Sequence, residues 1–188
     1  MRRLTAAIAL ALLVSLAGCS GFAGGALSDG TTGEDGGVTG EDDGATGEDG
    51  ASVVSAANST PDATGVEHTL RVEVNESTAG SEWESLSATY LREEFTVDGA
   101  KHGAVALGVD TDGDGEVEQE FNETHVSGVN NNEYSFTVGL DTGYMLEDGD
   151  AVVVAYPAVD NPAESGEYDV SVTLNDDQTA NGTLAVEE

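Results

Sequence analysis

Apolar side chains recur at every second position in short runs from Val66 onward, and this alternation limits the fold more than any other feature of the sequence. A period of two is typical of β-strands with one face on a core and the other face in water. The alternating runs lie at residues 70–74, 86–90, 105–109, 134–140, 168–174 and 184–186. Residues 151–156 are apolar without interruption, which predicts a strand that is buried on both faces or nearly so.

Clusters of Asn, Gly, Asp and Pro separate these runs, as in turns between strands. About seven or eight short strands in residues 66–188 predict an all-β fold, an immunoglobulin-like antiparallel β-sandwich. A segment of this length can bury a sizeable core. One stretch is ambiguous, because Trp83, Leu86 and Tyr90 would also share one face of a short helix.

The N-terminus has the three parts of a signal peptide, namely a positive start, an uncharged apolar stretch and small residues before Cys19. The apolar stretch is shorter than the ~20 residues that span a bilayer. Leu16-Ala17-Gly18-Cys19 resembles the lipobox of prokaryotic lipoproteins, which implies removal of residues 1–18 and lipidation of Cys19. We therefore expect an exported protein that a lipid on Cys19 holds at the outer, extracellular face of the cell membrane.

Cys19 is the single cysteine of the chain, so its lipidation leaves no thiol for a disulfide, a metal site or a nucleophile. The pair Arg2 and Arg3 is compatible with twin-arginine export, although the residues that follow match that pattern poorly. The general secretory route and the twin-arginine route therefore both stay open.

Residues 19–65 are predicted to be a flexible linker between the lipid and the folded domain. A Thr-Gly-Glu-Asp pattern begins at Thr32, Thr39 and Thr46, and no apolar seam accompanies this period, so a coiled coil is rejected. Sequence that is rich in Gly and acids and lacks large apolar side chains cannot offset the entropy of ordering. The domains are thus expected at 1–18, 19–65 and 66–188.

Acidic residues dominate the charge. The chain holds 37 acidic and 5 basic residues, a formal net charge of −32. Without residues 1–18 the three remaining basic residues face all 37 acidic ones, a net charge of −34. This composition resembles that of halophilic archaeal proteins, in which concentrated salt screens self-repulsion. Nucleic-acid binding needs a basic surface and is excluded.

Three strings, at residues 107–115, 149–157 and 161–170, resemble segments of secreted proteins of halophilic archaea. The resemblance covers residues 66–188 and is to an extracellular β-sandwich module of surface lipoproteins and larger cell-envelope proteins. It implies an immunoglobulin-like fold and implies no particular activity.

The sharpest local motif is a series of aspartates at alternate positions followed by Gly115, which resembles the first half of an EF-hand calcium loop. An EF-hand itself is rejected, because its twelfth position would be Phe121 and strands flank the loop. A Ca²⁺-binding hairpin loop remains a hypothesis, against a solvated acidic turn that binds no ion. Its expected ligands are Asp110, Asp112, Asp114, the backbone carbonyl of Glu116, and Glu118.

No pattern in the sequence predicts an enzyme. Asp141-Thr142-Gly143 resembles the triplet of aspartic proteases, but those enzymes need two facing carboxylates, and the triplet is also a good turn. None of the three histidines is paired at metal-ligand spacing, so they are interpreted as surface or hydrogen-bonded loop residues. Four sequons predict N-glycan acceptors at Asn58, Asn75, Asn122 and Asn181.

These observations predict a membrane-anchored extracellular lipoprotein with a non-catalytic β-sandwich domain that acts in cell-envelope structure or adhesion, with other cell-surface proteins as partners. The alternative is a lipoprotein that binds a cation or a cationic solute through its acidic loops, with Ca²⁺ as the candidate ion in the loop of Asp110 and Asp114.

Overall fold

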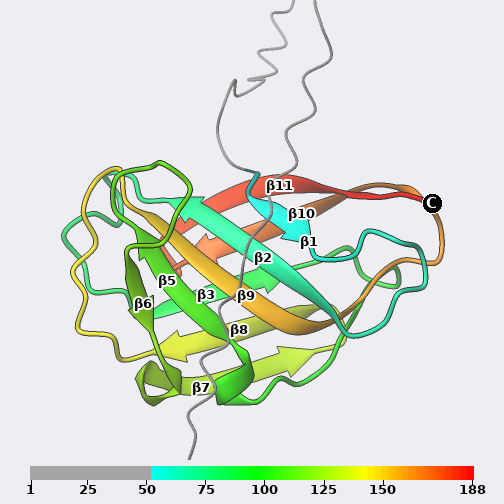
Figure 1. The fold of residues 1–188 in the computed structure, drawn as a ribbon, viewed down its shortest axis with the longest axis horizontal. Coiled ribbons are helices and arrows are strands. Elements are labelled where there is room, and N and C mark those ends of the chain that lie inside the picture. Colours follow the sequence, from blue (N-terminus) through cyan, green and yellow to red (C-terminus); the bar gives the residue numbers. More distant parts are fainter. Residues whose placement is uncertain (1–51) are drawn as a thin grey trace, which may run out of the picture. The chain divides into compact units, whose positions relative to one another are not determined.

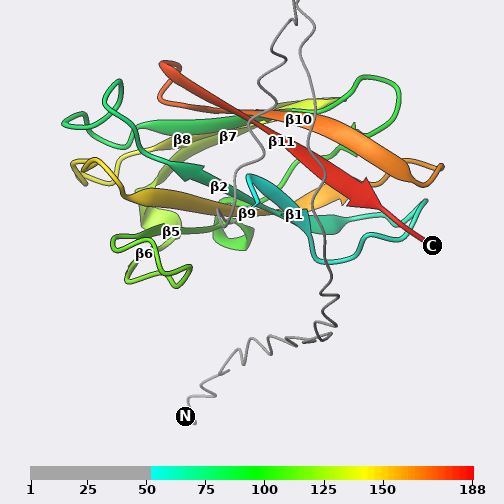
Figure 2. The same cartoon turned by 90° about the horizontal axis from the view of Figure 1, so that it is seen from above.

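A computed structural model describes residues 52–188, which form two antiparallel β-sheets packed face to face (Figure 1 and Figure 2). In spatial order, the six-stranded sheet contains β1 (Val54–Ala56), β2 (Val66–Glu73), β9 (Ala151–Asp160), β5 (Ala106–Asp110) and β6 (Gln119–Phe121), and β4 (Thr96–Val97) pairs with β9. The five-stranded sheet contains β11 (Gln178–Val186), β10 (Gly166–Leu174), β3 (Ser85–Thr89), β8 (Ser135–Leu140) and β7 (Val126–Asn132). Two short 3₁₀ helices, η1 (His102–Ala104) and η2 (Glu123–His125), complete the described part.

The predicted fold class, an all-β immunoglobulin-like antiparallel sandwich, is confirmed. Every strand pair between residues 52 and 188 is antiparallel, and the chain passes from one sheet to the other between β2 and β3, β3 and β4, β6 and β7, β8 and β9, and β9 and β10. In that range no helix is both long enough and apolar enough to cross a bilayer.

The alternation of apolar residues locates the main strands correctly. The uninterrupted run predicted at 151–156 is the start of β9, which lies between β2 and β5 in the middle of its sheet. The helix considered around Trp83 is wrong, because residues 85–89 form β3 with Leu86 and Ala88 buried on one face. Strands β1, β4, β6 and β7 were not predicted, since they are short or lack alternation.

Ordered structure starts before Val66. Strand β1 lies inside the range that the sequence assigned to the linker, and it pairs with β2 at the edge of the six-stranded sheet. Further along this segment, the side-chain amide of Asn161 donates hydrogen bonds to the carbonyls of Asn58 (2.9 Å) and Thr60 (3.0 Å). The predicted signal peptide, Cys19 and the linker up to residue 51 lie outside the described residues.

The core fills the space between the two sheets. Phe136 from β8 stacks on Tyr156 from β9, with ring centroids 3.8 Å apart and planes 7° apart. Trp83 is fully buried and meets the edge of Phe121 at 5.7 Å. Large aromatic side chains are thus used to join the sheets rather than to line a surface.

His68 occupies a core position of β2, where the alternation calls for an apolar residue. Its Nε2 lies 3.2 Å from Oδ1 of Asn161, and its Nδ1 lies 3.2 Å from the hydroxyl of Tyr90. Because the amide nitrogen of Asn161 already donates to two carbonyls, its oxygen accepts from Nε2, and Nδ1 accepts from Tyr90. Both nitrogens of the neutral ring therefore have a hydrogen-bond partner.

Acid is expected to destabilise the domain through His68. Burial lowers the pKa of His68 from its ordinary 6.5 to about 4, although the hydrogen bond to Asn161 acts in the opposite direction. The folded state favours the neutral form of His68. The stability that this residue contributes is therefore complete above pH 6.5 and decreases as the pH falls toward 4. The difference corresponds to about 3 kcal/mol of unfolding free energy.

Urea unfolding across this pH range, in constant high salt, measures the loss. His102→Gln is the matched control, because His102 is exposed. The titration of Asp110 does not interfere with this measurement. Its pKa in the folded protein is lower than its ordinary 3.8, so its effect on stability falls below that pH. Equal pH dependence in the parent protein and in His68→Gln would show that His68 is not the titrating group.

Candidate functional site: the acidic loop between β5 and β6

The acidic loop, residues 110–118, connects the antiparallel strands β5 and β6 at one end of the six-stranded sheet (Figure 1). Gly113 and Gly115 have φ values of 77° and 95°, which side chains with a Cβ rarely adopt. These two glycines let the chain turn back around the first residue of the loop, Asp110.

Asp110 is the fixed point of the loop. It is the last residue of β5 and is fully buried. Its Oδ1 accepts from the backbone amides of Gly113 (2.7 Å) and Asp112 (3.3 Å), and its Oδ2 accepts from that of Gly115 (2.8 Å). Arg71 of β2 also donates to Oδ2 and forms an ion pair with it.

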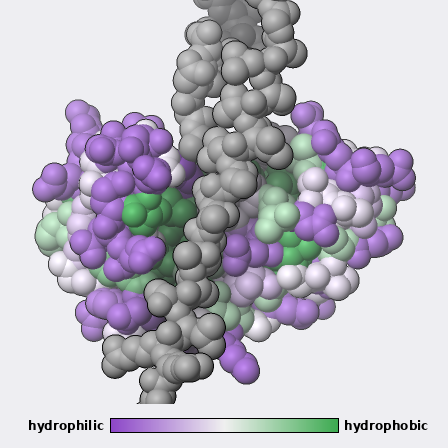
Figure 3. Space-filling view, in the orientation of Figure 1, coloured by the Kyte–Doolittle hydropathy of each residue, from purple (hydrophilic) through white to green (hydrophobic). Residues whose placement is uncertain are grey.

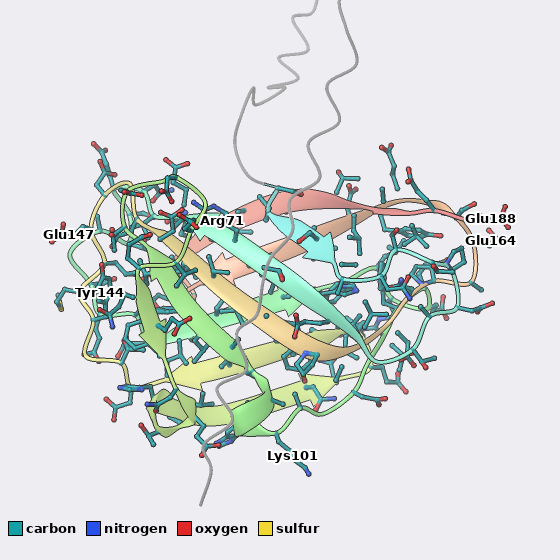
Figure 4. All side chains as sticks on the ribbon, viewed as in Figure 1. Arg71, Lys101, Tyr144, Glu147, Glu164 and Glu188 are labelled. Atoms are coloured by element: carbon teal, nitrogen blue, oxygen red, sulfur yellow. The ribbon has the colours of Figure 1, made fainter. Side chains whose placement is uncertain are left out.

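The charge state of Asp110 follows from these contacts. Burial alone would raise the pKa of Asp110, but the hydrogen bonds from Arg71, Gly115 and Gly113 together lower the pKa below its ordinary value. Asp110 is therefore an ionised carboxylate that its own loop covers on the outer face of the six-stranded sheet. Figure 4 shows Arg71 at this end of the sheet, beside the loop, while Lys101 extends into solvent at the opposite side of the domain.

The loop brings four of the predicted ligands together. Asp110, Asp112, Asp114 and Glu118 each place a carboxylate oxygen within 4.8 Å of the others. Glu118 is held by an amide hydrogen bond from Thr111 at 2.8 Å. Glu116, which was expected to contribute its carbonyl, is outside this group of side chains, and its amide donates to Asp114 at 2.8 Å.

This arrangement can hold positive charge in two ways. Oxygen ligands from several carboxylates suit Ca²⁺, which takes six to eight oxygens. Arg71 of β2 already supplies one positive charge to Asp110. A cation in the loop would therefore be held mainly by the exposed residues Asp112, Asp114 and Glu118, with Asp110 shared between the cation and Arg71.

A shallow hollow of about 700 Å³ lies over β5, β6 and β9, and an apolar patch is visible there in Figure 3. Its lining includes the small side chains of Ala106 and Ala155 and the carboxylate-bearing Glu120 and Glu123, and no Tyr or Trp lines it. Gly108 lies beneath it, and a Cβ there would come within 2.2 Å of Val117 Cγ1, so a larger residue would displace the Val117 side chain.

The protease-like triplet is a structural turn. Thr142 donates from its hydroxyl to the carbonyl of Trp83 at 3.0 Å, and the amide of Gly143 donates to Glu82 at 2.9 Å. Gly143 has a φ of 64°, as expected where a strand ends in a turn. Asp141 is exposed and belongs to no cluster of carboxylates among residues 52–188.

All four predicted glycan acceptors have exposed side chains: Asn58, Asn75, Asn122 and Asn181. The first three are in loops, where each side-chain oxygen accepts the amide hydrogen of the sequon's third residue, at 3.0, 2.9 and 3.0 Å. Asn181 instead lies in β11. Exposure makes each accessible, and their glycosylation stays a prediction.

Sequence reasoning missed two structural residues, Arg71 and His68. A signal existed for His68, since it interrupts an otherwise apolar alternation on β2. The sequence marks Arg71 only weakly, as one of three basic residues outside the predicted signal peptide. Its partner, Asp110, becomes visible only from the way the strands pair.

Known proteins resemble this chain only weakly, in structure rather than in sequence. No family model matches the chain, and no curated protein matches it. Among solved structures, BslA, a bacterial hydrophobin, has a TM-score of 0.40 at 16% identity, over 71% of this chain and 98% of that one. The collagen-binding subdomain of the Enterococcus faecalis surface protein ACE has a TM-score of 0.38 at 12% identity, over 72% of this chain and 94% of that one. A Nocardia farcinica protein with an immunoglobulin-like fold has a TM-score of 0.33 at 14% identity, over 69% and 81%.

Proposed function

We propose that this chain is a lipid-anchored extracellular protein whose β-sandwich acts without catalysis in cell-envelope structure or adhesion. The lipobox-like residues before Cys19, the acidic linker and the sandwich that follows it support this assignment. The net charge of −34 without residues 1–18 further suits a protein that works outside a halophilic cell, in concentrated salt.

The observation that carries the choice between a structural module and a solute binder is the position of the aromatic residues. A solute site in this chain would be expected to display Trp83 or tyrosines around converging acids. Trp83, Tyr90 and Tyr156 are instead buried in the core, and the half-buried Tyr134, Tyr144 and Tyr168 line neither the hollow over β5 and β6 nor the carboxylate cluster of the acidic loop. Aliphatic residues, Phe121 and several polar side chains line the hollow over β5 and β6, and the acids that converge do so on the acidic loop.

Replacement of Cys19 by Ser is expected to release the protein from the membrane. Two lipid chains bury enough CH₂ groups, at about 0.8 kcal/mol each, for firm anchoring, and Ser cannot carry the thioether. The parent protein should sediment with membranes and be digested when protease is added to intact cells. The Cys19→Ser protein should appear in the medium or in the soluble fraction. Retention of Cys19→Ser on washed membranes would contradict the anchor.

A second candidate function, Ca²⁺ binding by the acidic loop, is favoured by one specific observation. Four carboxylates from a stretch of nine residues converge within 4.8 Å, and one of them is buried and fixed by backbone amides. Three of the four are exposed, so the affinity expected is the weak 10⁻⁴–10⁻³ M that is typical of extracellular modules.

Calorimetric titration with CaCl₂ in concentrated KCl tests this function. The parent protein should release or absorb heat on binding, and Asp112→Asn and Asp114→Asn should each weaken binding by about tenfold or more, since each removes a charged ligand. Asp148→Asn, on an exposed residue outside the cluster, is the matched control. Absence of heat with the parent protein would end the calcium hypothesis and leave the lipoprotein assignment intact.

A further inference from the structure

Strand β9 is apolar on its outer face as well as on its inner face, in the middle of the six-stranded sheet. Val152, Val154 and Tyr156 are buried against the other sheet, whereas Val153 and Ala155 are half-buried on the outer face. In an antiparallel sandwich the outer positions of a strand are usually polar, because water covers that face. An apolar outer face on a central strand therefore favours a segment that covers it.

The hollow of about 700 Å³ lies over this apolar face. Val153 and Ala155 line it together with Ala106 of β5, which is exposed. Val117 and Phe121 also line it. Because three of these five side chains are alanine or valine on the sheet itself, the hollow has room for larger apolar side chains of an occupant.

Carboxylates restrict what can occupy the hollow. Glu120 and Glu123 are exposed and line it, so a strongly acidic segment would be repelled. Residues 29–51 of the predicted linker contain eight acidic residues, and residues 20–28, Ser-Gly-Phe-Ala-Gly-Gly-Ala-Leu-Ser, contain none. Residues 20–28 also hold Phe22, which is the single aromatic residue of the predicted linker before residue 52, and Leu27.

The strand register brings the start of the described chain close to the hollow. Val54 of β1 pairs with Leu70, Leu70 pairs with Val154, and Val154 pairs with Leu107, which forms one row across the sheet (Figure 1). Three strand spacings of about 4.8 Å place β5 only ~14 Å from β1. A flexible chain with the length of residues 29–51 would have an r.m.s. span of about 26 Å. Residues 20–28 can therefore reach the hollow from residue 52.

We propose that residues 20–28 dock in this hollow, with Phe22 and Leu27 against Val153, Ala155 and Ala106. The contact is intramolecular, so residues 29–51 keep the segment at an effective concentration in the millimolar range, where a small apolar contact is sufficient. Concentrated salt also screens the repulsion between the acidic linker and the acidic domain.

This inference rests on the proposed function, because removal of residues 1–18 leaves residues 20–28 next to the lipid on Cys19. Docking then holds the outer face of the six-stranded sheet near the membrane, and release lets the domain move away by the length of residues 29–51. The anchored sandwich thus has a close position and a distant position.

Rates of disulfide formation test the docking in the full chain with Cys19→Ser, which contains no native thiol. One thiol is introduced in the hollow by Ala106→Cys and the other by Ala23→Cys, which keeps both apolar anchors. Thr39→Cys with Ala106→Cys is the matched control. Chain entropy alone favours the control, because the loop from residue 39 is shorter than the loop from residue 23.

We expect Ala23→Cys to form the intramolecular disulfide at least about tenfold faster than Thr39→Cys, in dilute protein and concentrated KCl. Each rate is divided by the rate at which iodoacetamide alkylates the same linker thiol in urea, which corrects for differences in thiol pKa. Adding Phe22→Ser and Leu27→Ser should remove the advantage without introducing charge. Ala23→Cys with Thr137→Cys, on the outer face of the other sheet, should be slow. Thr124→Cys, which is exposed and lines the hollow, replaces Ala106→Cys if that variant fails to fold.

Three results would overturn the proposal. The first is a faster disulfide from Thr39→Cys, as loop length alone predicts. The second is an advantage of Ala23→Cys that survives Phe22→Ser and Leu27→Ser. The third is a disulfide that forms mainly between two chains, since a second copy would then occupy the hollow. None of these results bears on the lipid anchor, which the membrane retention of the parent protein and of Cys19→Ser tests separately.

Discussion

Dilution of the protein from ~1 M to ~0.1 M salt is expected to unfold the sandwich. The chain holds 37 acidic residues against 5 basic ones, and the described residues contain one ion pair, between Arg71 and Asp110. Most of the negative charge is therefore unpaired and repels itself across the surface. The Debye length grows from ~3 Å to ~10 Å over this dilution, so charges on neighbouring strands and loops begin to act on one another.

Circular dichroism during a KCl titration measures this transition, which should be reversible. A variant that combines Glu76→Gln, Glu133→Gln and Glu164→Gln is the matched control, because all three glutamates are exposed. Its midpoint should move to lower salt, since each substitution removes a repelling charge without changing the core. Full native structure at ~0.1 M salt, or a midpoint that does not respond to these substitutions, would contradict the role of charge.

Replacement of Arg71 by Met should cost about 1.5–3 kcal/mol of unfolding free energy, the range for a lost hydrogen bond to a charged group. Asp110 is fully buried, its lowered pKa keeps it ionised, and Arg71 is its ion-pair partner. Met fills much of the same volume but leaves the loop-covered carboxylate of Asp110 without its positively charged partner. The loop amides of Gly113 and Gly115 continue to donate to Asp110, so the loss is large without necessarily abolishing folding.

Urea unfolding at constant high salt gives this free energy. Arg92→Met is the control, since Arg92 lies on the surface over the Tyr134 ring, 4.2 Å from its centroid, and its loss should cost less than about 1 kcal/mol. Adding Asp110→Asn to Arg71→Met should recover part of the loss by removing the buried charge. Equal destabilisation by Arg71→Met and Arg92→Met would show that the buried pair is unimportant.

The same variant links stability to the calcium hypothesis. Arg71 and a loop-bound cation both neutralise Asp110, so Ca²⁺ should stabilise Arg71→Met more than the parent protein. Because Ca²⁺ would bind only the folded state, the stabilisation should grow as the Ca²⁺ concentration rises above its dissociation constant. If Ca²⁺ stabilises neither protein, the loop is a solvated turn whose order depends on Asp110 and Arg71.

The sequence predicted those parts of the fold that depend on local periodicity. Alternation located β2, β8 and β10, and the continuous apolar run located β9 in the middle of a sheet. Strand β7 was missed because its Ser, Gly and Asn residues show no alternation, and its pairing with β8 depends on residues distant from any local signal. The aspartates of the acidic loop were found from their spacing, because all of them lie within one turn.

Contacts between distant residues could not be predicted in the same way. The ion pair between Arg71 and Asp110 depends on both β2 and β5 pairing with β9 in a particular register. His68 and Asn161 are 93 positions apart in the sequence, and nothing near either residue predicts the hydrogen bond between them.

The mass of the N-terminal peptide, measured on protein extracted from native membranes with detergent, tests the central claim that a lipid on Cys19 holds the sandwich outside the cell. The account predicts a chain that begins at Cys19 and carries the added mass of a lipid on that residue, with residues 1–18 absent. A chain that begins elsewhere, or one in which Cys19 carries a free thiol, would contradict it.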